Sequence, residues 1–135
     1  MLYSIQNTID KANLLLISVQ IWEYKLVFDI DTGATYNIIF DYVYNQLKEG
    51  FVDMGKSINM FGIEGKRTDN KTVKADLEFD KTILTTEFQV VDAMDAVTNF
   101  QNDFGIQLHG ILGVQFLKDN NCVIDFANKT IKIGE

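Results

Sequence analysis

The chain has 135 residues, 47% of them apolar and 23% charged, as is ordinary for one folded domain spanning residues 1–135. Its formal net charge of −7 argues against a nucleic-acid partner, because proteins that bind the phosphate backbone usually carry a basic face. Cys122 is the only cysteine and His109 the only histidine. An intramolecular disulfide is therefore excluded, and we expect no metal site and no cofactor.

The N-terminal segment predicts neither a secretory signal nor a membrane span. Its first five residues lack a basic stretch, and the apolar run from Leu14 to Val19 is too short to cross a bilayer. We therefore expect a cytoplasmic protein with no membrane partner.

The first half of the chain predicts short strands and one helix. Strands are expected from Leu14 to Gln20, from Lys25 to Asp31 and at Ile38-Ile39. A short amphipathic helix is expected over Phe40–Leu47, where apolar residues recur at the 3, 4, 7 spacing.

The second half continues with strands from Ser57 to Asp92. The clearest is Thr72–Phe79, in which apolar and polar residues alternate. We expect a long loop or lid over Asp92–Leu108, a short helix over Val114–Asp119 and a closing hairpin over Cys122–Ile133. Together these elements predict a mostly β, closed or highly curved domain with one or two short helices.

Asp31 is the residue to which the sequence assigns chemistry. It ends an apolar strand, which brings its carboxylate to a defined point, and Gly33 two residues later lets another backbone approach closely. The triplet Asp31-Thr32-Gly33 also fits an ordinary surface turn, so its context must decide between the two interpretations.

That context resembles a known family. Phe28–Thr35 resembles the active-site strand and loop of the retropepsin-like aspartic proteases. His109–Leu117 resembles their second loop, in which two apolar residues and a glycine precede a short helix. Cys122–Ile131 resembles their closing hairpin and Gly62–Gly65 their flap, so the resemblance extends from about residue 14 to residue 133.

The resemblance implies a closed β-barrel that corresponds to one half of a two-lobed pepsin-like enzyme. In such enzymes two catalytic aspartates about 3 Å apart share one proton, activate a water and polarise the peptide carbonyl. This chain has one Asp-Thr-Gly, so a second copy would supply the other aspartate in a symmetric homodimer. The implied function is an aspartic endopeptidase that acts on peptides or proteins.

The resemblance also assigns individual roles. Asp31 would be catalytic, Thr32 would brace the two active-site loops across the dimer axis, and Gly33 would face the substrate backbone. Ala34 stands where pepsin-like enzymes usually have a hydroxyl. The remaining implied site residues are the second-loop residues Ile111, Leu112 and Gly113 and the substrate-binding residues Asp29, Gly62, Ile63 and Gly65.

Asp29 departs from the family, which usually has an aliphatic residue there. Residues i and i+2 of a strand point to the same face, so Asp29 and Asp31 are expected to point the same way. Two interpretations stay open. The strand twists and carries Asp29 to solvent or to a backbone donor, or Asp29 forms an acidic wall that selects basic substrate side chains.

Other departures lie in the flap and the second loop. Glu64 stands where glycine is common, and His109 and Gln115 stand where relatives often have aspartate. We expect His109 to be a packing residue rather than a catalytic one. These departures favour an alternative function, a non-catalytic retropepsin-fold module that dimerises or binds a peptide.

Overall fold

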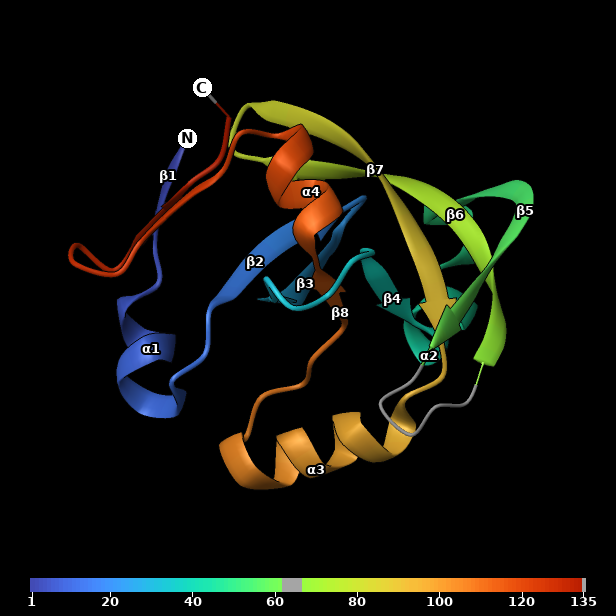
Figure 1. Cartoon of the computed structure of the whole chain (residues 1–135), viewed down its shortest axis with the longest axis horizontal. Coiled ribbons are helices and arrows are strands. Elements are labelled where there is room, and N and C mark those ends of the chain that lie inside the picture. The colour runs from blue at the N-terminus through green and yellow to red at the C-terminus, as the bar shows by residue number, and fades with distance from the viewer. Residues whose placement is uncertain (62–66, 135) are drawn as a thin grey trace.

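The computed structural model describes residues 1–61 and 67–134, in which two sheets and four α-helices form (Figure 1). The strands are β1 (Leu2–Ser4), β2 (Leu16–Ile21), β3 (Tyr24–Ile30), β4 (Ile38–Phe40), β5 (Val52–Phe61), β6 (Arg67–Phe79), β7 (Thr82–Val91), β8 (Gly110–Leu112), β9 (Val123–Asp125) and β10 (Thr130–Lys132). The helices are α1 (Gln6–Ala12), α2 (Asp41–Gln46), α3 (Met94–Phe104) and α4 (Val114–Asp119), with one 3₁₀ turn, η1 (Lys48–Gly50).

Seven strands form the larger sheet, in the order β2-β3-β8-β4-β7-β6-β5. The short strand β8 lies between β3, to which it is parallel, and β4, to which it is antiparallel. A further pairing of Gln20 with Glu78 joins β2 to β6. The mostly β architecture is as predicted, and closure of this sheet into a barrel stays a prediction.

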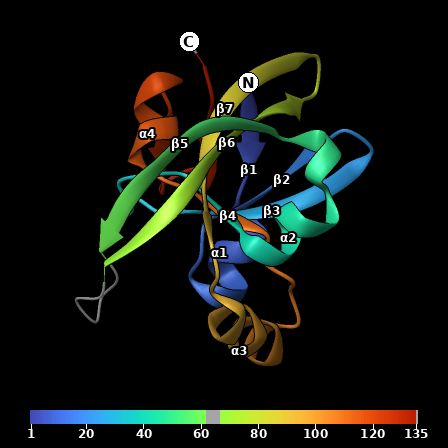
Figure 2. The same cartoon turned by 90° about the vertical axis from the view of Figure 1, so that its right-hand side faces the viewer.

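The smaller sheet contains three strands in the order β1-β10-β9 and includes the predicted C-terminal hairpin. The terminal ammonium group of Met1 donates to the carbonyl of Ile133 at 2.8 Å, so the two ends of the described chain lie together (Figures 1 and 2). Because β10 is the central strand, the edges of this sheet are β1 and β9.

The core is filled by apolar residues that alternate along the strands. Val73, Ala75, Leu77 and Phe79 of β6 are all buried, as their period of two predicts. Phe28 of β3 stacks on the buried ring of Phe88, with the ring centroids 5.7 Å apart. Aromatic packing in the core therefore stabilises β3, the strand that leads to Asp31.

The two predicted helices form, as α2 and α4, but two more are present. The expectation of a loop or lid over Asp92–Leu108 was wrong, because most of this segment is the helix α3. Its polar residues concealed an apolar face: Val97 is buried, and Phe100 packs against the core. Gly105 ends the helix in the left-handed conformation, with φ of 69°.

The helix α1 was also missed, because it has only seven residues and its apolar positions are limited to Ile9 and Ala12. It lies at the same end of the molecule as α3, opposite α4, in both views (Figures 1 and 2). Among the helices of the described residues, none is long and apolar enough to span a membrane.

Candidate active site

Asp31 lies in a tight turn directly after β3. Its Oδ1 accepts the backbone N–H of Gly33 at 2.8 Å, and its carbonyl accepts the N–H of Ala34 at 3.2 Å. Its own N–H donates to the carbonyl of Leu112 at 3.0 Å, which ties the turn to β8. The carboxylate is therefore held in one orientation while its side chain stays partly exposed.

The second loop lies against this turn, as the sequence predicts. Ile30 pairs with Leu112 and Asp29 with Ile111, so Gly113, which follows β8, lies beside the Asp31 turn. A Cβ atom on Gly113 would lie 2.5 Å from the carbonyl oxygen of Ala34 and would collide with it. Only glycine permits this approach, which the N–H of Val114 completes by donating to the carbonyl of Ala34 at 2.8 Å.

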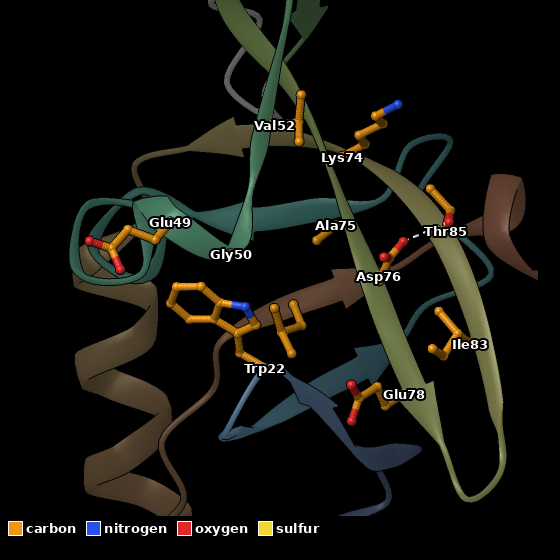
Figure 3. A pocket seen from close by; sticks show the side chains of 11 residues that line it. Trp22, Glu49, Gly50, Val52, Lys74, Ala75, Asp76, Glu78, Ile83 and Thr85 are labelled. Atoms are coloured by element: carbon orange, nitrogen blue, oxygen red, sulfur yellow. Dashed lines mark hydrogen bonds between the residues drawn. The ribbon is translucent and has the colours of Figure 1, made fainter.

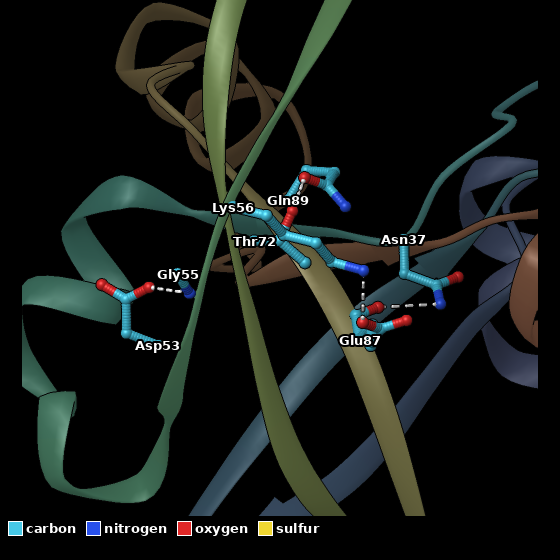
Figure 4. Close-up of polar contacts among 7 residues, drawn as sticks. All are labelled: Asn37, Asp53, Gly55, Lys56, Thr72, Glu87 and Gln89. Carbon is cyan, nitrogen blue, oxygen red and sulfur yellow. Dashed lines mark hydrogen bonds and ion pairs between the residues drawn. The ribbon is translucent and has the colours of Figure 1, made fainter.

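Asn37, which was not among the predicted site residues, is buried and connects three segments. Its Oδ1 accepts the N–H groups of Gly113 at 2.9 Å and Phe116 at 3.3 Å. Its Nδ2 donates to the carbonyl of Glu87 at 3.1 Å, and its carbonyl accepts the N–H of Gln89 at 2.8 Å (Figure 4). Asn37 thus fixes the second loop to the strand β7 behind it.

Asp29 and Asp31 line one pocket of about 560 Å³, as expected from their alternation along the strand. The other lining residues are mainly apolar: Ile9, Asn13, Leu14, Leu15, Ile30, Thr32 and Phe126. Burial, and to a smaller extent the charge of Asp31, raise the pKa of Asp29 to about 6. The structure thus favours a carboxylate inside the pocket over one that reaches a backbone donor.

His109 directly precedes β8 and lies beside Val27 of β3, at the end of this strand pair away from Asp31. Its Nδ1 accepts the N–H of Val27 at 2.8 Å, so a neutral ring carries its proton on Nε2. Burial lowers the pKa of His109, which favours this neutral form. Its contacts agree with the packing role that we expected.

The remaining predicted residues divide into two groups. Thr32 and Gly33 are exposed at the tip of the turn. Gly62, Ile63 and Gly65 lie outside the described residues. The strands that lead to and from them are described: β5 and β6 pair up to Phe61 and Arg67 (Figure 2).

A second pocket, of about 410 Å³, lies elsewhere, between the β2–β3 turn and strands β5 to β7 (Figure 3). It contains Trp22, Asp76 and Glu78, but the carboxylate of Asp76 already accepts a hydrogen bond from Thr85 at 2.6 Å. Within the described ranges, no three His, Cys, Asp or Glu side chains are grouped to hold a metal ion. The pocket of Asp29 and Asp31 is therefore the candidate active site.

Comparison with known proteins indicates which fold the chain shares with them. No protein-family model matches the chain. A retrovirus-related Pol polyprotein from transposon 412 of Drosophila melanogaster is 29% identical over 102 residues, or 75% of this chain. The chain spans only 7% of that polyprotein's length.

Three solved structures have a similar fold. The retroviral protease-like domain of Ddi1 from Leishmania major has a TM-score of 0.63 at 14% identity, and the match covers 89% of this chain and 87% of that one. EIAV protease with the inhibitor HBY-793 has a TM-score of 0.54 at 20% identity, covering 77% of this chain and 85% of that one. A retropepsin-like aspartic protease from Rickettsia conorii has a TM-score of 0.58 at 13% identity, covering 97% of this chain and 87% of that one. In fold, and in the sequence of its active-site turn and second loop, the chain resembles the retropepsin-like, retroviral-type aspartic proteases.

Proposed function

We propose that this chain is an aspartic endopeptidase that acts as a homodimer, with one Asp31 from each protomer. The observation that carries the proposal is the Asp31 turn, held by Leu112 and packed on Gly113 within a retropepsin-like fold. Two of the solved structures with a similar fold are named as proteases, EIAV protease and the retropepsin-like aspartic protease from Rickettsia conorii.

The chemistry follows from placing two such turns face to face. Two carboxylates about 3 Å apart cannot both ionise, so the pair would hold one proton. The ionised carboxylate takes a proton from a water between them, and the protonated one donates a hydrogen bond to the scissile carbonyl. The N–H of Gly33 already fixes Oδ1 of Asp31, which leaves Oδ2 for water or substrate.

The homodimer is a requirement of this chemistry, since one chain supplies one catalytic aspartate. We place part of the interface on the three-stranded sheet at the chain ends, which contains the predicted hairpin over Cys122–Ile133. Its central strand β10 is already paired on both sides, so β1 and β9 are the edges open to a partner. Leu2 on β1 and Val123 on β9 are apolar and more than half exposed, at 68% and 55%.

The same proposal includes two finer features of the fold. The pairing of Gln20 with Glu78 supports closure of the larger sheet into a barrel. Residues 1–135 would form one such domain. Two of these domains related by a twofold axis would correspond to the two lobes of a pepsin-like enzyme.

A peptide-cleavage assay tests the function. Wild-type protein and Asp31→Asn are incubated with a denatured peptide library between about pH 4 and 7, and products are identified by mass spectrometry. We expect cleavage by the wild type and none by Asp31→Asn, because an amide cannot activate water. Asp103→Asn, an exposed change on α3, is the matched control and should cleave normally. Binding of peptide without cleavage by the wild type would favour the alternative, a non-catalytic binding module.

A further inference from the structure

The pocket that contains Asp31 is lined by apolar side chains and by two carboxylates. Leu14, Leu15 and Phe126 contribute apolar surface, whereas Asp29 and Asp31 are the only ionisable groups among the lining residues in the described part of the chain. Within residues 1–61 and 67–134, no lysine or arginine lines it. The pocket therefore combines a surface for an aliphatic chain with negative charge.

Asp29 lacks a counter-charge within the described part of the chain. None of the hydrogen bonds or ion pairs of the described side chains involves its carboxylate, although the Asp31 carboxylate beside it is held by Gly33. A half-buried carboxylate without a partner is unfavourable when ionised, and the raised pKa of Asp29 reflects this. A cation that enters the pocket would relieve both the burial and the repulsion from Asp31.

We propose that this pocket takes a lysine or arginine side chain of the peptide substrate next to the scissile bond, with Asp29 as its ion-pair partner. The alkyl stem of such a side chain would cover Leu14, Leu15 and Phe126, and its charged end would reach the carboxylate. Asp29 is then a specificity-determining residue and Asp31 the catalytic one. This inference rests on the proposed function, because it concerns the substrate of the same site.

The decisive experiment measures binding without turnover. Asp31→Asn protein is titrated into fluorescein-labelled hexapeptide libraries that are random except at one position, fixed either as lysine or as norleucine. Norleucine keeps the alkyl stem and lacks the charge. With the fixed position scanned along the peptide, we expect one position at which lysine binds roughly 10-fold more tightly, as for a charge-assisted contact. Adding Asp29→Asn should abolish that preference.

Equal binding of the two libraries at every position, or no binding of either, would overturn the inference. So would a lysine preference that persists in the Asp29→Asn protein. Cleavage separates this failure from failure of the proposed function. If the wild type cleaves, Asp31→Asn does not, and Asp29→Leu leaves the cleavage sites unchanged, the function stands and only the basic specificity is wrong. If Asp31→Asn cleaves normally, the proposed function itself is wrong.

Discussion

Removing the charge of Asp29 should stabilise the protein at neutral pH. The folded state raises the pKa of this carboxyl from its ordinary value of 3.8 to about 6. A shift of that size corresponds to roughly 3 kcal/mol, and partial exposure to solvent reduces it to about 1–2 kcal/mol. Because the folded pKa is the higher one, Asp29 favours folding below pH 3.8, and this contribution is lost as the pH rises to about 6.

Asp29→Asn cannot ionise, so it should be about 1–2 kcal/mol more stable than the wild type at pH 8. The difference should shrink toward zero near pH 4. Urea denaturation across this range measures it, with the protein concentration held constant because dimerisation also stabilises the fold. Asp103→Asn is the exposed control. A stability difference that does not change with pH would refute the burial argument.

Two further predictions concern the frame around Asp31. Asn37→Ala should lower the free energy of unfolding by about 3 kcal/mol or more, because it leaves the buried N–H of Gly113 and the partly buried carbonyl of Glu87 without partners. Asn45→Ala, at an exposed position of α2, should cost less than about 0.5 kcal/mol. Similar losses from both variants in urea denaturation would contradict the role of Asn37. Gly113→Ala should lower stability by about 1–3 kcal/mol or more and reduce cleavage, since its Cβ would meet backbone oxygen at 2.5 Å. Unchanged unfolding and cleavage would show that the second loop tolerates the added methyl group.

The turn at Asp31 and the loop at Gly113 could be recognised from the sequence because their signals are local. Asp31 and Gly33 are two residues apart at the end of an apolar strand, and Gly113 follows two apolar residues before a short helix. Each pattern can be recognised without knowledge of the other. The resemblance to the family predicts that the two segments are in contact. In the structure, the N–H of Asp31 donates to the carbonyl of Leu112, the residue before Gly113.

Asn37 could not be found in this way. Its side-chain partners lie 76, 79 and 50 residues away, in Gly113, Phe116 and Glu87, so no local pattern marks it. A lone asparagine after a loop is ordinarily a turn residue. Only the tertiary structure brings three segments within reach of one amide.

The helix α3 was missed for a different reason. Its composition is polar. Ala93 and Gln101, the residues four before and four after Val97, lie on the same helix face as Val97, and Gln101 is polar. The sequence features that indicate a helix here are the four-residue spacing of Phe100 and Phe104, whose rings lie 4.9 Å apart, and Gly105 at the C-terminal end. The polar composition of the segment favoured a loop instead.

The proposed active site needs one Asp31 from each of two chains. Wild-type and Asp31→Asn chains are mixed in equal amounts in urea, refolded together and assayed for peptide cleavage. If both aspartates are required, only about one quarter of the dimers are active, and activity per wild-type chain falls to about half. Undiminished activity per wild-type chain would contradict the claim, because it would show that one Asp31 suffices.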